Sequence, residues 1–218
     1  MIWAVAAAGA LATECPTTVA KGASEPLDAN GTLARSFATL NYPEDMIRSF
    51  NLRAAVDSLR LHVAKDPESA KMEKAFPGFS SALLQRAPAM LGSLLDQRVP
   101  WLYRCMAEKL QRKVARPDLD MAVAYLKSEA GKQKLQDSTD YTIWRYLRSG
   151  PFSKSELKKM KTGPRNGSKD APVGASRAAA ALLPVLERWG EEQRNAEAMA
   201  LGDLAEEIVA EMTSSDPA

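Results

Sequence analysis

SSALLQRAPAMLGSLLDQRVPWLYRCMAEKLQRKVA, residues 80–115, is the stretch that decides the fold of this 218-residue chain. Its apolar side chains recur every three or four residues, which is the spacing of one face of an α-helix. They are Leu84, Ala87, Leu91, Leu94, Leu95, Leu102, Cys105, Met106 and Leu110. Pro88 and Pro100 interrupt the pattern, which therefore predicts kinks or separate helices here.

Helical spacing continues on both sides of this stretch. After a turn at 28–31, helices are expected at 31–40, at 43–64, from 66 to about 76, at 117–127, from 128 to about 149, and at 173–213 with a kink at Pro184. No run of four to eight residues alternates as a strand would. The sequence thus predicts an all-α fold, an irregular multi-helix bundle of about seven helices.

The chain divides by composition into five parts. Residues 29–150 form the predicted helical core, residues 151–172 a basic loop, and residues 173–218 a C-terminal helical region that packs back on the core. Residues 13–28, rich in polar and turn-forming residues, are expected to be a flexible leader. Residues 1–12 are interpreted as a signal peptide.

The signal-peptide interpretation depends on the apolar run 2–11, which is too short to span a bilayer. Ala10-Leu11-Ala12 offers a small-x-small cleavage pattern, but no Lys or Arg precedes the run. A start site assigned too far downstream would account for that. The alternative is an alanine-rich first helix of the fold.

Two cysteines, Cys15 and Cys105, lie far apart and form no C-x-x-C pair. They suit one disulfide in an oxidising compartment, and the alternative is two unrelated thiols with Cys105 as a small core residue. The chain has a single histidine, His62, so triads and multi-histidine metal sites are not expected. Carboxylates such as Asp118 and Asp120 fit solvated helix faces, which leaves a carboxylate-dependent hydrolase as the weakest hypothesis. We therefore expect no catalytic, cofactor-binding or metal-binding residues.

One motif stands out, the segment YLKSEAGKQ at 125–133. It resembles the signature of the DUF2059 family, in which an aromatic pair precedes x-Ser-Pro-x-Gly and a basic or amide residue. Leu126 stands where an aromatic residue is usual, and Glu129 replaces the proline. The resemblance covers roughly residues 90–150. It implies a helical protein of the kind found mainly among bacterial exported proteins, and it supplies no function and no catalytic residues.

The motif also has a physical interpretation. Ser128 can cap a helix by accepting a hydrogen bond from a backbone N–H two or three residues further on. Gly131 allows close approach of another segment or unusual backbone angles. We interpret Ser128 and Gly131 as a structural corner between two helices.

A basic segment follows, with eight Lys or Arg between Arg145 and Lys169 against one acid, Glu156. Candidate polyanion contacts are Lys154, Lys158, Lys159, Lys161 and Arg165. Nine acids against two arginines lie between Glu187 and Asp216, so the two regions can complement each other within one fold or between two copies.

These features favour a non-enzymatic, exported accessory or binding protein of the bacterial envelope, in the periplasm or outside the cell, with no cofactor and no transmembrane segment. Its partner is unidentified: an envelope protein, an anionic surface or a second copy all fit. The alternative is a cytoplasmic helical adaptor or regulator that contacts polyanions through residues 144–169.

Overall fold

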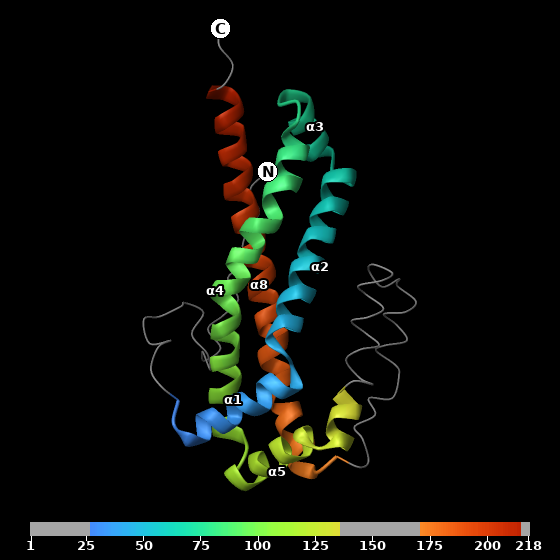
Figure 1. Cartoon of the computed structure of the whole chain (residues 1–218). Coiled ribbons are helices and arrows are strands. Elements are labelled where there is room, and N and C mark those ends of the chain that lie inside the picture. The colour runs from blue at the N-terminus through green and yellow to red at the C-terminus, as the bar shows by residue number, and fades with distance from the viewer. Residues whose placement is uncertain (1–26, 136–170, 215–218) are drawn as a thin grey trace.

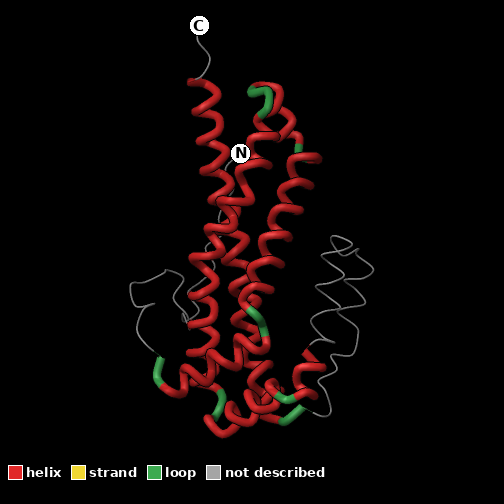
Figure 2. Tube along the Cα trace, in the orientation of Figure 1, coloured by secondary structure: helices red, strands yellow, loops and turns green. Residues whose placement is uncertain are grey.

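The computed structural model describes residues 27–135 and 171–214, and each regular element in this part of the chain is a helix (Figures 1 and 2). In chain order the helices are α1 (Ala29–Asn41), α2 (Glu44–Lys65), α3 (Pro67–Ala75), α4 (Phe79–Lys113), α5 (Arg116–Lys127) and α8 (Val173–Ser214). A further helical segment, 129–135, follows α5. The predicted all-α multi-helix fold is confirmed.

Aspartate side chains begin two of the helices. Asp28 Oδ1 accepts a hydrogen bond from the Gly31 N–H at 2.7 Å, and α1 therefore starts at Ala29, within the turn that the sequence predicted at 28–31. Asp66 accepts from the Ser69 N–H at 2.9 Å and caps α3. Pro43 lies one position before α2, at the N-cap, where its missing N–H costs nothing.

Of the two alternatives expected at Pro88 and Pro100, separate helices are wrong, and a kink at each proline stays a prediction. Both prolines lie inside α4, a single helix of 35 residues. Each proline removes one helical hydrogen bond and costs about 3 kcal/mol in an isolated helix. A buried apolar stripe that runs from Phe79 to Leu110 offsets that cost. Pro184 is likewise accommodated within the 42-residue helix α8.

The three long helices α2, α4 and α8 give the molecule an elongated form, with α1 and α5 crossing at the lower end of Figure 1 and α3 at the upper end. Helix α4 packs against α1, α2, α3 and α8, and α5 packs against α1 and α8. Helix α8 runs alongside α4 for most of its length.

Two apolar cores share these long helices. The lower core joins α1, α5, the C-terminal half of α4 and the N-terminal half of α8. Its largest fully buried side chains are Phe37, Leu95, Leu102, Tyr103, Met106, Leu110, Leu119 and Leu182. The upper core joins α2, the N-terminal half of α4 and the C-terminal half of α8. Its buried residues are Ala55, Val56, Leu59, Phe79, Leu83, Ala87, Leu91, Leu204 and Ile208.

A polar group, made of Arg98 from α4 and of Gln193 and Glu197 from α8, lies at the contact between these two helices. Gln193 is 2% exposed and is the one buried polar side chain among the described residues. Its Oε1 accepts from Arg98 Nε at 2.7 Å, and its Nε2 donates to Glu197 Oε1 at 2.9 Å. Further up, Arg86 of α4 contacts both Glu207 and Glu211 of α8, at 2.5 and 2.9 Å. These contacts fix the register of α8 against α4.

Candidate functional site

Ser128 and Gly131 form a tight corner between α5 and the segment 129–135. Ser128 Oγ donates to the Tyr125 carbonyl at 2.6 Å and accepts from the Gly131 N–H at 3.2 Å. A Cβ atom on Gly131 would lie 2.0 Å from the Tyr125 carbonyl oxygen, a distance that no side chain tolerates. The corner therefore requires glycine at 131, and it directs the segment 129–135 back toward α1 and α8.

Residues on both sides of this corner, Tyr125 and Leu126 before it and Lys134 and Leu135 after it, line an apolar cavity of about 390 Å³, which we call the corner cavity. One wall comes from α1, the turn after it and α5, and a second wall comes from the segment beyond Ser128. Their residues are Phe37, Tyr42, Tyr125 and Leu126 for the first wall and Lys134 and Leu135 for the second. The third wall is the start of α8, where small side chains predominate: Ala175, Ser176, Ala179, Ala180 and Leu183. The volume lies within the range of small-molecule sites in proteins.

Tyr42 is held in place from the core side. The phenol of Tyr103, fully buried in α4, donates to the Tyr42 backbone carbonyl and ties the α1–α2 turn to the lower core. Burial raises the pKa of the Tyr42 phenol, so this group stays a neutral hydrogen-bond donor well into alkaline solution.

The α8 wall is fixed against α5 by two contacts. Arg177 Nη1 lies 2.8 Å from Asp118 Oδ2, which assigns Asp118 to an ion pair. A Cβ on Gly174 would come within 2.8 Å of the Asp118 carbonyl oxygen, so the two helices approach closely where the cavity begins. Two of the helices that line the cavity, α5 and α8, are therefore in direct contact beside it.

The cavity's lining carries little charge. Among the described residues that line it, Lys134 is the single charged one, and Asn41, Ser176 and the two tyrosine phenols supply the other polar groups. An apolar pocket with a few convergent polar groups is the usual form of a small-molecule site.

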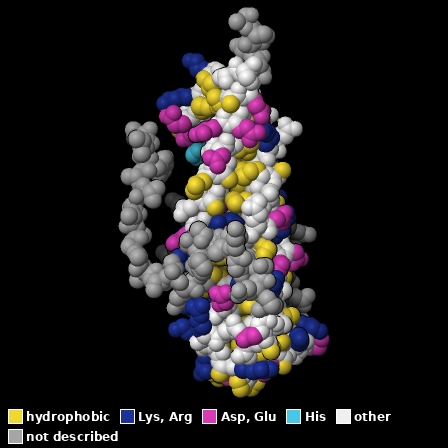
Figure 3. All heavy atoms as spheres, turned by 90° about the vertical axis from the view of Figure 1, so that its left-hand side faces the viewer, with side chains coloured by type: hydrophobic (Ala, Val, Ile, Leu, Met, Phe, Trp, Pro, Cys, Tyr) yellow, Lys and Arg dark blue, Asp and Glu magenta, His cyan; other side chains and the backbone are white. Residues whose placement is uncertain are grey.

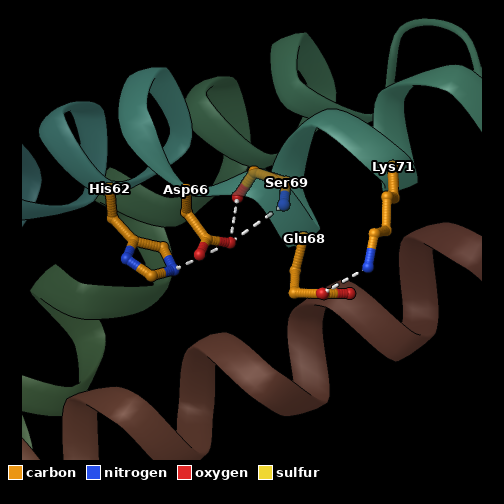
Figure 4. A network of polar contacts seen from close by, with 5 residues as sticks. All are labelled: His62, Asp66, Glu68, Ser69 and Lys71. Carbon is orange, nitrogen blue, oxygen red and sulfur yellow. Dashed lines mark hydrogen bonds and ion pairs between the residues drawn. The ribbon is translucent and has the colours of Figure 1, made fainter.

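His62, the lone histidine, takes part in a network at the α2–α3 corner (Figure 4). Its Nε2 lies 3.6 Å from Asp66 Oδ2, and the same carboxylate accepts from the Ser69 hydroxyl at 3.2 Å. The aspartate thus stands between histidine and serine, whereas a nucleophilic triad needs the histidine in the middle. His62 is also two-thirds exposed, so these three residues do not form a nucleophilic triad. The role of Asp66 is to cap α3.

Carboxylate pairs are also accounted for by neighbouring cations. Glu207 and Glu211 share Arg86, and Asp120 faces Arg116 at 3.9 Å. Within residues 27–135 and 171–214, no three His, Cys, Asp or Glu side chains gather as a metal site would require. No helix in the same ranges has the length and apolar character needed to cross a bilayer.

The remaining sites expected from the sequence are only partly within the described residues. Cys105 is 4% exposed, and it is disulfide-bonded and not a free thiol. Cys15 lies outside the described residues, so the Cys15–Cys105 pairing stays a prediction. Lys154, Lys158, Lys159, Lys161 and Arg165 also lie outside them. In the described part, Lys and Arg side chains gather around the lower end of the face in Figure 3.

Sequence reasoning did not identify the corner cavity. Of its lining residues, the motif 125–133 drew attention to Tyr125 and Leu126, which were interpreted as architectural. Phe37, Lys134 and Ala179 gave no signal, because residues so far apart in the chain come together only through the packing of α1, α5 and α8.

Comparisons with known proteins give no match: no family model, no curated protein and no solved structure is significantly similar to this chain. The resemblance to DUF2059 therefore stays a prediction.

Proposed function

We propose that this chain is an exported, non-enzymatic binding protein of the bacterial envelope, and that the corner cavity is its binding site for an apolar small molecule. The observation that carries the proposal is the cavity itself: about 390 Å³, bounded by helices, largely apolar and lined by three aromatic rings. Membership of the DUF2059 family, inferred from the motif that builds one wall, is part of the same proposal.

Two features support export. The apolar run 2–11 has the length of the central region of a signal peptide. Cys105 is disulfide-bonded, and stable disulfides form in oxidising compartments outside the cytosol.

A binding role without catalysis is supported by the state of the titratable groups in the described residues. Asp118 pairs with Arg177 and Asp120 with Arg116. His62 lies in the α2–α3 corner and is not among the residues that line the cavity. The cavity offers Lys134 but, among its described lining residues, no carboxylate, histidine or cysteine to work with it as a base or nucleophile.

Export is tested by the mass of the native protein isolated from cell fractions. We expect a periplasmic or secreted species that lacks residues 1–12 and gains mass on alkylation only after reduction. A cytosolic species with an intact N-terminus and two freely alkylated thiols would overturn the export proposal.

A second candidate is a cytoplasmic adaptor that contacts polyanions through residues 144–169. It is favoured by exposed cations at the α4–α5 corner, where Arg112, Lys113 and Arg116 lie close together in the chain. This candidate requires binding to duplex DNA or RNA that weakens steeply with salt and depends on Lys158, Lys159 and Lys161. Absence of binding to DNA and RNA at low salt would exclude this candidate function.

A further inference from the structure

Charge is distributed unevenly along the described part of the molecule. Residues 104–135, at the lower end, hold eight Lys or Arg against four Asp or Glu, whereas residues 191–214 of α8 hold seven acids against Arg194. On the face in Figure 3, Lys and Arg side chains gather around the lower end, and Asp and Glu side chains gather toward the upper end. Because the two regions lie at opposite ends of the molecule, they do not neutralise each other within the described part of one copy (Figure 1).

A groove between α4 and α8 carries much of the acidic charge. Its volume is about 640 Å³, and its floor is apolar, made of Ala89 and Met90 from α4 and of Ala200 and Leu204 from α8. Arg86, Asp203 and Glu207 form its charged rim. Arg86 is already shared by Glu207 and Glu211, and Asp203 makes no ion pair with another described residue. The rim of this α4–α8 groove therefore has a net negative charge.

Exposed side chains extend the groove onto the outer face of α8. Met199, Asp203 and Glu206 are spaced by four and three residues, so they share one face of the helix. Met199 is 72% exposed, and the two carboxylates beside it are also exposed. Apolar surface with unpaired carboxylates at its edge fits a partner that brings apolar and cationic side chains together.

The α4–α5 corner presents side chains of this kind. Arg112, Lys113 and Arg116 are exposed there, and the two arginines face carboxylates only at 3.9 Å. The carboxylate that faces Arg112 is shared with Arg104, at 3.2 Å, and Lys113 makes no ion pair with another described residue. The corner therefore keeps a net positive charge. Met121, on the next turn of α5, is 51% exposed and adds apolar surface.

We propose that two copies of this chain associate side by side and antiparallel, with the α4–α5 corner of each copy on the α4–α8 groove of the other. A two-fold axis midway between groove and corner makes both contacts at once, so the assembly is a closed dimer. The two contacts lie about 35 Å apart, which is the length of α4 from Met90 to Lys113 at about 1.5 Å per residue. This inference does not rest on the proposed binding function.

The face available to such a dimer is large enough. Helices α4 and α8 run alongside each other and present a face about 50 Å long and about 20 Å wide, given the dimensions of an α-helix. A standard protein interface buries about 800 Å² on each partner. The antiparallel arrangement places opposite charges together at both ends of this face.

The first measurement is the mass of the full chain in solution. Sedimentation velocity in about 0.1 M NaCl is compared with sedimentation in about 1 M NaCl. We expect a dimer at low salt and at least tenfold weaker association at high salt, because salt screens contacts between exposed charges. A monomer at both salt concentrations overturns the proposal and leaves the groove to a partner of another kind.

The second measurement reverses the charge of each surface separately. Asp203→Lys with Glu206→Lys reverses the groove side, and Arg112→Glu with Lys113→Glu reverses the corner. Each double variant should associate at least tenfold more weakly than the unchanged chain, because like charges then meet at both contacts.

Single reversals elsewhere serve as controls. Glu191→Lys lies on another face of α8, and Lys74→Glu lies on α3, and both positions are exposed. These variants should leave the association unchanged. Circular dichroism checks the helix content of every variant.

A mixture of the two double variants distinguishes a lost contact from a lost fold. Each reversed surface then meets a surface of opposite charge on the other chain, so both contacts are again attractive. We expect the mixture to form a one-to-one dimer, although neither variant does so alone.

Association that survives both reversals, or that the mixture does not restore, overturns the assignment of these two surfaces. Species that grow beyond a dimer as concentration rises would show an open head-to-tail contact, and would overturn the closed antiparallel arrangement.

Discussion

The lower and upper cores are built on the same two long helices, yet they are closed to different degrees. Of the 19 buried residues of the lower core, 13 are at most 1% exposed, whereas of the nine buried residues of the upper core three are, namely Ala87, Leu91 and Ile208. The lower core has α1 and α5 packed across it, while α3, at the upper end, contributes no buried residue. The crossing helices α1 and α5 thus close the lower core more completely than the upper core, which the three long helices close by running alongside one another. The corner cavity lies where α1 and α5 meet α8.

The largest expected effect compares one leucine from each core. Leu102→Ala should cost about 4 kcal/mol of unfolding free energy and Leu204→Ala about 2 kcal/mol, because a tightly enclosed site cannot collapse around the lost volume. Leu102 is fully buried and Leu204 is 6% exposed. Urea unfolding followed by circular dichroism measures both. Equal losses of unfolding free energy in the two variants would show that the two cores are equally well packed, and would contradict the difference proposed here.

Substitution of two glycines, one at each end of the molecule, tests the same difference between the lower and upper halves. Gly131→Ala should destabilise the lower end by about 2–3 kcal/mol, because the new Cβ must displace the α5 backbone. Gly202→Ala lies on the upper half of α8, where a new Cβ would meet no atom within 4 Å. This change should stabilise the protein by roughly 0.5–1 kcal/mol through its helix propensity. Thermal unfolding of the two variants shows whether each substitution raises or lowers the stability of the protein. A stable G131A would mean that the corner can open without cost.

Glu197, in the polar group on the α4–α8 contact face, makes folding depend on pH. Burial raises its pKa, so the folded chain holds this proton more tightly than the unfolded chain does. Stability from this group is therefore present at low pH and is lost as pH rises through the raised pKa. Glu197→Gln should stabilise the protein near pH 7 and have little effect near pH 4, close to the ordinary pKa of a glutamate. Glu206→Gln, at an exposed position on the same helix, serves as the control.

The smallest effect concerns the ion pairs that join α4 and α8 in the upper half. Arg86→Gln should cost about 0.5–1 kcal/mol, because Glu207 and Glu211 are largely solvent-exposed and such pairs are weak. The loss should shrink in high salt. Hydrogen exchange at 204–212 of α8 should quicken while exchange at 178–189 stays unchanged. An equal change in both halves would indicate that the cores are not independent.

Much of the fold could be predicted from the sequence, because apolar spacing reports which face of a helix is buried. The helix expected at 117–127 carries Leu119, Ala122, Val123 and Leu126 at helical spacing, and all four are buried in α5. Separate helices were wrongly expected at the prolines of α4, because helix propensity is a local quantity. It does not include the burial of the apolar stripe of α4, which offsets the cost of each proline. Tyr103, fully buried, was missed because its phenol has a partner, the Tyr42 carbonyl, that sequence spacing does not reveal.

The site was less accessible to sequence reasoning than the fold. Ser128 and Gly131 were identified as a corner, since a capping serine and a glycine three residues later have local physical causes. That this corner encloses a cavity depends on Phe37 and Ala179, both distant from it in the chain, and on the angle at which α8 crosses α5. Long-range packing of this kind leaves no periodic trace in one sequence.

Helix α8 has a consequence for the order in which the molecule forms. It supplies Ala178, Leu182 and Trp189 to the lower core and Leu204 and Ile208 to the upper core, and it follows every other described helix in the chain. While the ribosome is still synthesising the preceding residues, at about 5–20 residues per second, neither core has all its parts. The lower core therefore stays unfinished until synthesis has passed residue 189 and the upper core until it has passed residue 208, and before then the chain can still be threaded through a narrow channel.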